Sequence, residues 1–237
     1  MTTPRPLAGR IALVTGASRG IGKATAIALA AAGAHVILTA RTEGGLIEAD
    51  DAIAAAGGSA TIAPLDLADA DGTARLGAAV GQRWGRLDML VLNAAMLGSL
   101  VPVWGADAKE FARVFDLNLA APQRLIAAFD PWLRAAPAGQ LIALTSSVAV
   151  HPRAYWGPYA ASKAALETLA LCYAEEVRNI SAVRVALVDP GATATTMRAR
   201  AFPGEDAAAL KPPSTVGEAI ARLCSEGFET GARVRVG

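Results

Sequence analysis

The chain has 237 residues, of which 53% are hydrophobic, and its 22 basic side chains nearly balance 21 acidic ones. This length and apolar content suit one large domain better than two small ones. A net charge of +1 without a lysine or arginine run argues against nucleic acid or an anionic membrane as partner. Apolar stretches are broken before the roughly 20 residues of a membrane span, and Met1 to Pro6 lack a signal-peptide core, so we expect a cytoplasmic protein.

Strand-length apolar runs alternate with longer helical patterns along the whole chain. We expect strands at Ile11–Thr15, His35–Thr39, Ala60–Leu65, Met89–Leu92, Leu141–Thr145, Val183–Val188 and Arg233–Val236. We expect helices at Ile21–Ala32, Glu43–Ala56, Asp69–Trp84, Asp107–Leu133, Tyr159–Asn179 and Thr215–Glu226. Near-continuous apolar strands that alternate with helices are typical of a parallel sheet covered on both faces. The fold class predicted is therefore α/β, a single-domain Rossmann-type doubly wound sheet of about seven strands.

Two features qualify this pattern. Pro122 and Pro131 should kink or end the fourth helix, since proline cannot continue the hydrogen-bond ladder. The segment from Thr193 to Pro213 contains several Pro and Gly residues and reads as a long irregular excursion, which in a compact domain is often a substrate lid.

The only two cysteines, Cys172 and Cys224, each occur in an Ala/Leu-rich helical context. A thiol in such a context usually acts as a small buried hydrophobe. We therefore expect both side chains to be buried and neither to have a functional role.

A glycine-rich turn from Thr15 to Gly22 follows the first predicted strand and opens the first helix. Backbone N–H groups and the helix dipole at such a place bind a pyrophosphate. The spacing Gly-x-x-x-Gly-x-Gly differs from the dinucleotide fingerprint, so the turn is a variant of the same device. A triphosphate-binding loop is excluded, because five residues separate Gly16 from Gly22 and Ala24 follows Lys23.

The residues after the second strand indicate NADP rather than NAD. NAD sites place an acid there to hold the ribose 2′-hydroxyl, whereas NADP sites offer positive charge to a 2′-phosphate. Here Ala40 stands at the acid's position and Arg41 follows, while Arg19 in the glycine turn can reach the same phosphate. The alternative is that Arg41 only solvates a loop.

Two further strand ends offer polar groups to a nucleotide. Asp66-Leu67 ends the third strand, where a carboxylate can accept from the adenine amino group, and Asn93-Ala94 ends the fourth. Asp66 could instead be a plain helix cap.

Tyr159 and Lys163 lie four residues apart in an Ala-rich helical run, so both side chains project from one helix face. A nearby cation stabilises a phenolate and should lower the phenol's pKa from its free value of about 10. Tyr159 is thus a candidate general acid and base.

Hydride delivery to a carbonyl also needs a hydrogen-bond donor placed at the oxygen. Ser146 lies 13 residues before Tyr159 and Ser147 lies 12 before it, and both follow the fifth strand. We favour Ser146, with Ser147 as the alternative that serves the loop. Asn118 falls mid-helix, where an amide is a poor helix former and needs a reason to be present; a plain surface role is its alternative.

Taken in order, these motifs resemble the short-chain dehydrogenase/reductase family over nearly the whole chain: Thr-Gly-x-x-x-Gly-x-Gly, Asp-Leu, Asn-Ala-x, Asn, Ser, Tyr-x-x-x-Lys and Pro-Gly. The stretches Ala154 to Lys163 and Thr196 to Pro203 resemble its YciK-type bacterial oxidoreductases. The resemblance implies that Tyr159 is the general acid and base and that Lys163 lowers its pKa and binds the nicotinamide ribose. It also implies that Ser146 polarises the carbonyl and that Asn118 holds a water in a proton relay.

The residues expected to contact NADP are Gly16, Ser18, Arg19, Gly20, Ile21, Gly22, Arg41, Asp66, Leu67, Asn93, Ala94, Tyr159, Lys163, Pro190, Gly191, Thr193 and Thr195. Ala95 stands where the family often has Gly and should tighten the contact between cofactor and backbone. Val148, Val150, Trp156, Met197 and Phe202 suggest an apolar substrate pocket, although such residues could equally be core.

The expected function is an NADP(H)-dependent oxidoreductase acting on a ketone, aldehyde or secondary alcohol as a small-molecule substrate. We expect no metal, and the resemblance implies a homo-oligomer, either dimer or tetramer. One alternative is a catalytically idle NADP-binding regulator or scaffold on the same fold. Another is reduction of a 3-oxoacyl carrier protein, although the neutral charge balance offers no basic patch for an acidic carrier.

Overall fold

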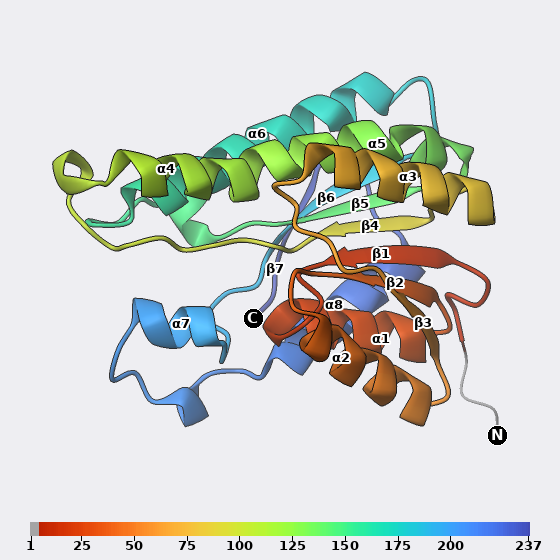
Figure 1. The fold of residues 1–237 in the computed structure, drawn as a ribbon, viewed down its shortest axis with the longest axis horizontal. Helices are drawn as coiled ribbons and strands as arrows, with labels where there is room; N and C mark the ends of the chain where they lie inside the picture. Colours follow the sequence, from red (N-terminus) through yellow and green to blue (C-terminus); the bar gives the residue numbers. More distant parts are fainter. Residues whose placement is uncertain (1–4) are drawn as a thin grey trace.

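Seven parallel strands form one sheet in the computed structural model, which describes residues 5–237 (Figure 1). The strands are β1 (Ile11–Thr15), β2 (His35–Thr39), β3 (Ser59–Ile62), β4 (Met89–Leu92), β5 (Gln140–Leu144), β6 (Arg184–Asp189) and β7 (Ala232–Arg235). Their order across the sheet is β3-β2-β1-β4-β5-β6-β7. The order reverses between β1 and β4, which is the switch point where such sheets bind ligands. The predicted doubly wound sheet is confirmed.

Helices cover both faces of the sheet. The helices are α1 (Gly20–Ala31), α2 (Glu43–Ala55), α3 (Ala70–Trp84), α4 (Ala108–Phe115), α5 (Ala121–Ala135), α6 (Gly157–Val177), α7 (Thr196–Ala201) and α8 (Pro213–Glu226). Figure 1 shows α1, α2 and α8 below the sheet and α3 to α6 above it. Alternate residues of β1 feed the two cores: Ala12 and Val14 pack with α1, α2 and α8, while Ile11 and Leu13 pack toward α3, α5 and α6.

The predicted fourth helix is interrupted rather than continuous. A π-helical turn, Asp116–Ala120, separates α4 from α5, and Pro122 lies in the first turn of α5. Proline is tolerated there because the first N–H groups of a helix have no intrahelical partner. Pro131 lies inside α5 without ending it. The expected break therefore occurs before Pro122, and Pro131 does not end the helix.

Other corrections are local. β3 ends at Ile62 instead of Leu65. The excursion from Thr193 to Pro213 is less irregular than predicted, since it contains the short helix α7 and a 3₁₀ turn at Ala207–Ala209.

The two cysteines differ. Cys224 is buried in α8, and burial raises the pKa of its thiol to about 12. Cys172 on α6 is exposed, so the prediction that it is buried is wrong. None of the helices in the described part of the chain is long and apolar enough to cross a membrane. Residues 1–4, part of the stretch read as lacking a signal sequence, lie outside the described residues.

Candidate active site

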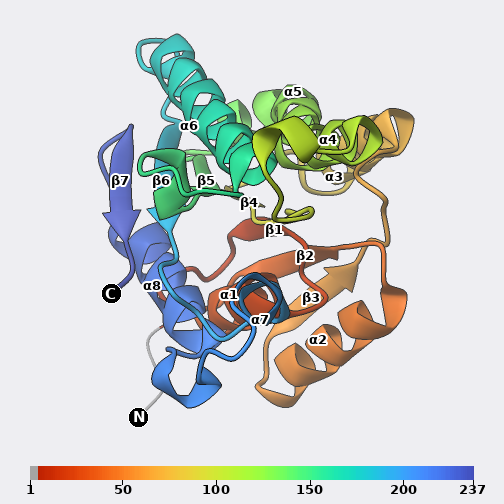
Figure 2. The same ribbon diagram turned by 90° about the vertical axis from the view of Figure 1, so that its left-hand side faces the viewer.

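The residues singled out from the sequence gather at the carboxyl edge of the sheet, which faces the viewer in Figure 2. β1 ends at the glycine turn, β4 ends before Asn93, β5 ends before Ser146 and β6 ends before Pro190. Because carboxyl ends of parallel strands meet at one edge, segments far apart in sequence build one site there.

The glycine turn is shaped for close approach of backbone. Gly16 and Gly20 have φ angles of +67° and +57°, a region that glycine enters without strain. A Cβ on Gly22 would lie 2.3 Å from the carbonyl oxygen of Gly16 and 2.4 Å from Asn93 Nδ2. Larger residues at Gly22 would therefore push the turn apart.

A hydrogen-bond network joins this turn to β4. The Thr15 hydroxyl donates to the Val91 carbonyl at 3.1 Å and accepts from the backbone N–H groups of Asn93 and Ala94 at 2.9 and 3.0 Å. Asn93 Nδ2 donates to the Thr15 carbonyl at 2.8 Å. The Asn93 side chain thus holds the glycine turn in place. Thr15 opens the predicted glycine turn, but its hydrogen bonds to β4 are a structural role that the sequence does not reveal.

The residues present fit a dinucleotide. Gly16, Ser18, Arg19, Gly20, Ile21 and Gly22 form the turn and the start of α1. The N-cap residue, Arg19, makes no side-chain hydrogen bond to the first turn of α1, so that turn's N–H groups have no side-chain cap to displace before they meet a pyrophosphate. Arg19 and Arg41 are exposed, and no ion pair within residues 5–237 involves either. Both guanidiniums are available to a 2′-phosphate.

Asp66, after the third strand, is not the residue that caps helix α3. The N-cap of α3 is Asp69, whose carboxylate accepts from Gly72 N–H at 2.8 Å. Asp66 is exposed, and its Oδ1 accepts from Ala68 N–H at 3.0 Å within the turn, while Leu67 is buried. Asp66 is therefore not the helix cap, and its contact with adenine stays a prediction.

Asn118 is fully buried, which excludes the surface alternative. It lies in the π-helical turn, where its Oδ1 accepts from Met96 N–H at 2.8 Å. Its Nδ2 donates to the Met96 carbonyl at 2.9 Å and to the Ser162 hydroxyl at 3.0 Å. The amide therefore joins the loop after β4 to α6, next to the Tyr159–Lys163 turn. Such π turns occur frequently at functional sites.

Tyr159 and Lys163 project from one face of α6 as predicted. Both are buried, and Lys163 Nζ lies 6.0 Å from the centre of the Tyr159 ring. Lys163 Nζ donates to the Leu144 carbonyl at the end of β5 at 2.7 Å. The ammonium is thereby fixed between the tyrosine helix and the strand that carries Ser146.

The ionisation of Tyr159 differs from the sequence-based expectation. Burial, followed by the negative charge of Asp189, raises the pKa of Tyr159 to about 12, and a hydrogen bond from Ser146 only partly opposes the rise. Burial also lowers the pKa of Lys163 to about 8, against the opposing effect of Glu167. The predicted lowering of the Tyr159 pKa by Lys163 is thus not seen in the protein alone. The phenol is held in its protonated, donating form.

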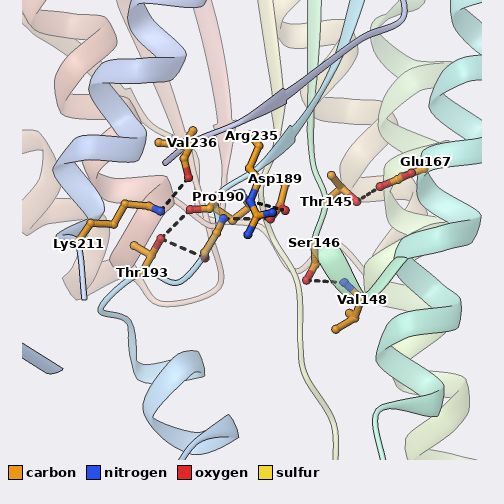
Figure 3. Close-up of polar contacts among 11 residues, drawn as sticks. Thr145, Ser146, Val148, Glu167, Asp189, Pro190, Thr193, Lys211, Arg235 and Val236 are labelled. Atoms are coloured by element: carbon orange, nitrogen blue, oxygen red, sulfur yellow. Dashed lines mark hydrogen bonds and ion pairs between the residues drawn. The ribbon is translucent and has the colours of Figure 1, made fainter. Parts of the chain in front are cut away.

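A cavity of about 190 Å³ opens beside the two serines. Its lining includes Ser146, Ser147, Glu167 and Asp189. Ser146 begins the turn after β5, and its Oγ accepts weakly from Val148 N–H at 3.5 Å (Figure 3). Both serines are half-buried, so their positions alone leave the choice between them open.

The segment after β6 approaches the glycine turn. Gly191 follows Pro190 with a φ of +63°. The Thr193 hydroxyl donates to the Pro190 carbonyl at 3.0 Å, and the Thr195 hydroxyl caps α7 by accepting from Arg198 N–H at 3.1 Å. A Cβ on Gly20 would lie 3.6 Å from Thr195 Cγ2. These residues border the expected nucleotide position, and their contact with it stays a prediction.

Apolar side chains line the same end of the molecule. The Trp156 ring lies 6.0 Å from that of Tyr159 and 5.6 Å from that of Phe202, between ring centres. Met197 packs on the small cluster formed by Leu97, Val148, Tyr159 and Ala160. Trp156 therefore links the tyrosine to the Thr193–Pro213 segment. Val150, by contrast, is 58% exposed.

Comparison with known proteins agrees with this geometry. A family model described as short chain dehydrogenase matches residues 10–206. The chain is 37% identical over 210 residues to the uncharacterized oxidoreductase YciK of Escherichia coli (strain K12), which covers 87% of this chain and 82% of YciK.

Solved structures are similar over almost the entire length. A short chain dehydrogenase from Pseudomonas syringae is 37% identical with a TM-score of 0.95, covering 100% of this chain and 98% of that one. One from Shigella flexneri 2a, complexed with NADP, is 34% identical with a TM-score of 0.94, covering 99% of each chain.

A glycine turn and a tyrosine–lysine pair at the carboxyl edge of a doubly wound sheet define a nucleotide-dependent oxidoreductase. The chain belongs to the short-chain dehydrogenase family, and the YciK-type resemblance predicted from its sequence is confirmed.

Proposed function

We propose that this protein is an NADP(H)-dependent reductase of ketones or aldehydes, with a secondary or primary alcohol as product. The observation that carries the proposal is the convergence of Ser146, Tyr159 and Lys163 at the end of β5. Tyr159 and Lys163 project from α6, Lys163 bonds to the Leu144 carbonyl, and Ser146 hydrogen-bonds to Tyr159. The Shigella flexneri structure, which is complexed with NADP, supports the choice of cofactor.

The chain's own residues supply the acid and the oxyanion donors. When bound, NADPH supplies the hydride. Ser146 donates a hydrogen bond to the substrate carbonyl oxygen and stabilises the negative charge that gathers there. Tyr159 transfers its proton to that oxygen, and the ammonium of Lys163 stabilises the phenolate that remains. A buried phenol of raised pKa suits reduction, since it holds a proton at neutral pH.

The cofactor choice predicts a selective effect of Arg41→Glu. The change removes a charge-assisted contact to the 2′-phosphate, worth about 1.5–3 kcal/mol, and adds repulsion. NADPH affinity should fall by about tenfold to several hundredfold, while NADH affinity changes little. Fluorescence titration of both cofactors measures this, with Arg41→Gln separating lost attraction from added repulsion. Equal losses for NADPH and NADH would refute the role of Arg41.

A carbonyl screen tests the proposed activity. Purified protein is mixed with NADPH and a panel of ketones and aldehydes, and loss of the nicotinamide absorbance is followed. At least one carbonyl class should be reduced faster than in matched reactions with the Tyr159→Phe variant. The apolar side chains of Trp156, Met197 and Phe202, which pack near Tyr159, favour substrates with an apolar substituent.

The other functions make distinct predictions. An idle NADP-binding regulator or scaffold would bind NADPH tightly and reduce no carbonyl in the panel. A 3-oxoacyl carrier-protein reductase would turn over a carrier-linked substrate far better than the same acyl group on a small thiol. The site's buried acid and donors favour catalysis over an idle role, and the net charge of +1 offers no basic patch to an acidic carrier.

We propose that the Thr193–Pro213 segment acts as a substrate lid. Phe202, which directly follows α7, packs on Trp156 at the start of α6. An ion pair between Arg198 and Glu205, at 2.5 Å, joins two parts of the segment. Lids of this kind exclude water from the reacting atoms.

The lid proposal predicts a change in hydrogen exchange. Amides from Ala192 to Leu210 should exchange fast in the free protein and measurably slower with NADP(H), because cofactor binding orders the segment. Amides of β1 should be protected in both states and serve as the internal control. Equal protection of the segment with and without cofactor would identify it as a fixed wall.

The remaining proposals concern association and location. We propose a cytoplasmic homo-oligomer, either dimer or tetramer. Phe111 is 42% exposed on α4, where it stacks on Phe115 with ring centres 4.6 Å apart, and this apolar pair offers a surface to a second copy. Sedimentation analysis of the wild type and of Phe111→Glu tests whether that surface is used.

A further inference from the structure

A buried carboxylate, that of Glu167, lies four residues beyond Lys163 on α6. Glu167 on α6 is only 6% exposed. It accepts a short hydrogen bond from the Thr145 hydroxyl (Figure 3). It also pairs with Arg233 of β7 at 2.5 Å. We call Thr145, Glu167 and Arg233 the Glu167 cluster. The spacing of four residues between Lys163 and Glu167 places both on one helix face, but the sequence does not show that Arg233 is the partner of Glu167.

Helical spacing places Glu167 on the same face of α6 as Lys163. Tyr159, Lys163 and Glu167 follow one another at intervals of four residues along α6, so they form a row on one face. A fully buried ammonium carries a large desolvation cost unless an opposite charge compensates it. The carboxylate of Glu167 is the group that opposes the lowering of the Lys163 pKa by burial.

The other end of the cluster reaches the substrate side. Thr145 immediately precedes Ser146, and Leu144, whose carbonyl accepts from Lys163 Nζ, immediately precedes Thr145. The same carboxylate therefore secures the strand end from which both Ser146 and the Lys163 anchor project.

The other charged groups nearby have separate partners. Asp189 of β6 lies 3.9 Å from Arg235 and acts on Tyr159. Arg233 is about half-exposed at 52% of its side chain, so it reaches Glu167 from the solvent edge of the sheet. Among the described residues that face Lys163, Glu167 is thus the carboxylate that acts on its charge.

We propose that Glu167 is a positioning residue, which keeps Lys163 protonated and anchored to Leu144 while Thr145 and Arg233 hold the carboxylate in place. The importance of Glu167 for catalysis rests on the proposed function. Its effect on the charge of Lys163 does not, because that effect exists in the protein without substrate or cofactor. Arg233 weakens the effect of Glu167 on Lys163, because the positive charge of Arg233 partly cancels the negative charge of the carboxylate.

The proposal predicts opposite effects of two substitutions. Glu167→Gln removes the negative charge and leaves Arg233 unopposed, so the pKa of Lys163 should fall from about 8, by about 1 to 3 pH units. Arg233→Gln leaves the carboxylate uncompensated, so the pKa of Lys163 should rise. The alkaline limb of the turnover profile should move in the same two directions.

The test is an NMR titration of protein labelled at the lysine ε carbons, without substrate or cofactor. Lys163→Met assigns the Lys163 signal, and Lys23, Lys109 and Lys211 are internal references. A lower Lys163 pKa in Glu167→Gln and a higher one in Arg233→Gln support the proposal. An unchanged pKa, or the same direction in both variants, would overturn it and leave the cluster a structural brace.

Should Glu167→Gln fail to fold, Arg233→Gln still decides, because the replaced side chain is 52% exposed and the Glu167 carboxylate keeps its hydrogen bond from Thr145. A Lys163 pKa that falls or stays constant in that variant contradicts the proposal. Since no step needs turnover, failure of the carbonyl screen and failure of this titration are separate results.

Discussion

Replacing Tyr159 with phenylalanine should lower turnover by about 100-fold to 10,000-fold, the usual contribution of a general acid. The change removes only the hydroxyl, so the buried ring keeps its contact with Trp156. NADPH affinity should therefore remain nearly unchanged. Initial-rate kinetics on the carbonyl found in the screen, together with cofactor titration, measure both quantities.

Tyr155→Phe is the matched control for that variant. Tyr155 lies four residues earlier, is 57% exposed and precedes α6, so loss of its hydroxyl should leave turnover close to wild type. If Tyr159→Phe retained near-normal turnover, or if both variants lost activity equally, Tyr159 would not be the proton donor.

Ser146→Ala should reduce kcat by about 100-fold to 1,000-fold, as expected for loss of one hydrogen-bond donor at a developing oxyanion. Ser147→Ala should cost far less, because the backbone carbonyl of Ser147, which the substitution retains, accepts from His151 N–H at 2.8 Å and holds the loop. Parallel steady-state kinetics of the two variants give the ranking. The opposite ranking would assign the carbonyl contact to Ser147.

The sheet and the nucleotide turn were predictable because their causes are local. β1 is a run of five apolar or β-branched residues, all buried, and the glycines that follow it are demanded by backbone angles and close contacts. The position of Tyr159 and Lys163 on one face follows from helical periodicity alone.

What escaped prediction depends on contacts between distant segments. The π-helical turn at Asn118 coincides with hydrogen bonds to Met96 and Ser162, which lie 22 and 44 residues away in sequence. The Tyr159 pKa depends on burial and on Asp189 of another strand. Likewise, Glu167 reads as an ordinary helix residue until Arg233 of the last strand is placed beside it.

Transfer of deuterium from NADPH to a carbonyl carbon tests most directly the central claim, that this protein reduces ketones or aldehydes. NADPH deuterated at the transferable position of its nicotinamide is incubated with the protein and the carbonyl panel, and the alcohols formed are examined by mass spectrometry. We predict an alcohol that carries the deuterium on its former carbonyl carbon, formed at least about 100-fold more slowly in matched reactions with Tyr159→Phe. Tight NADPH binding with no labelled alcohol from any carbonyl in the panel would contradict the account and favour a nucleotide-binding protein without reductase activity.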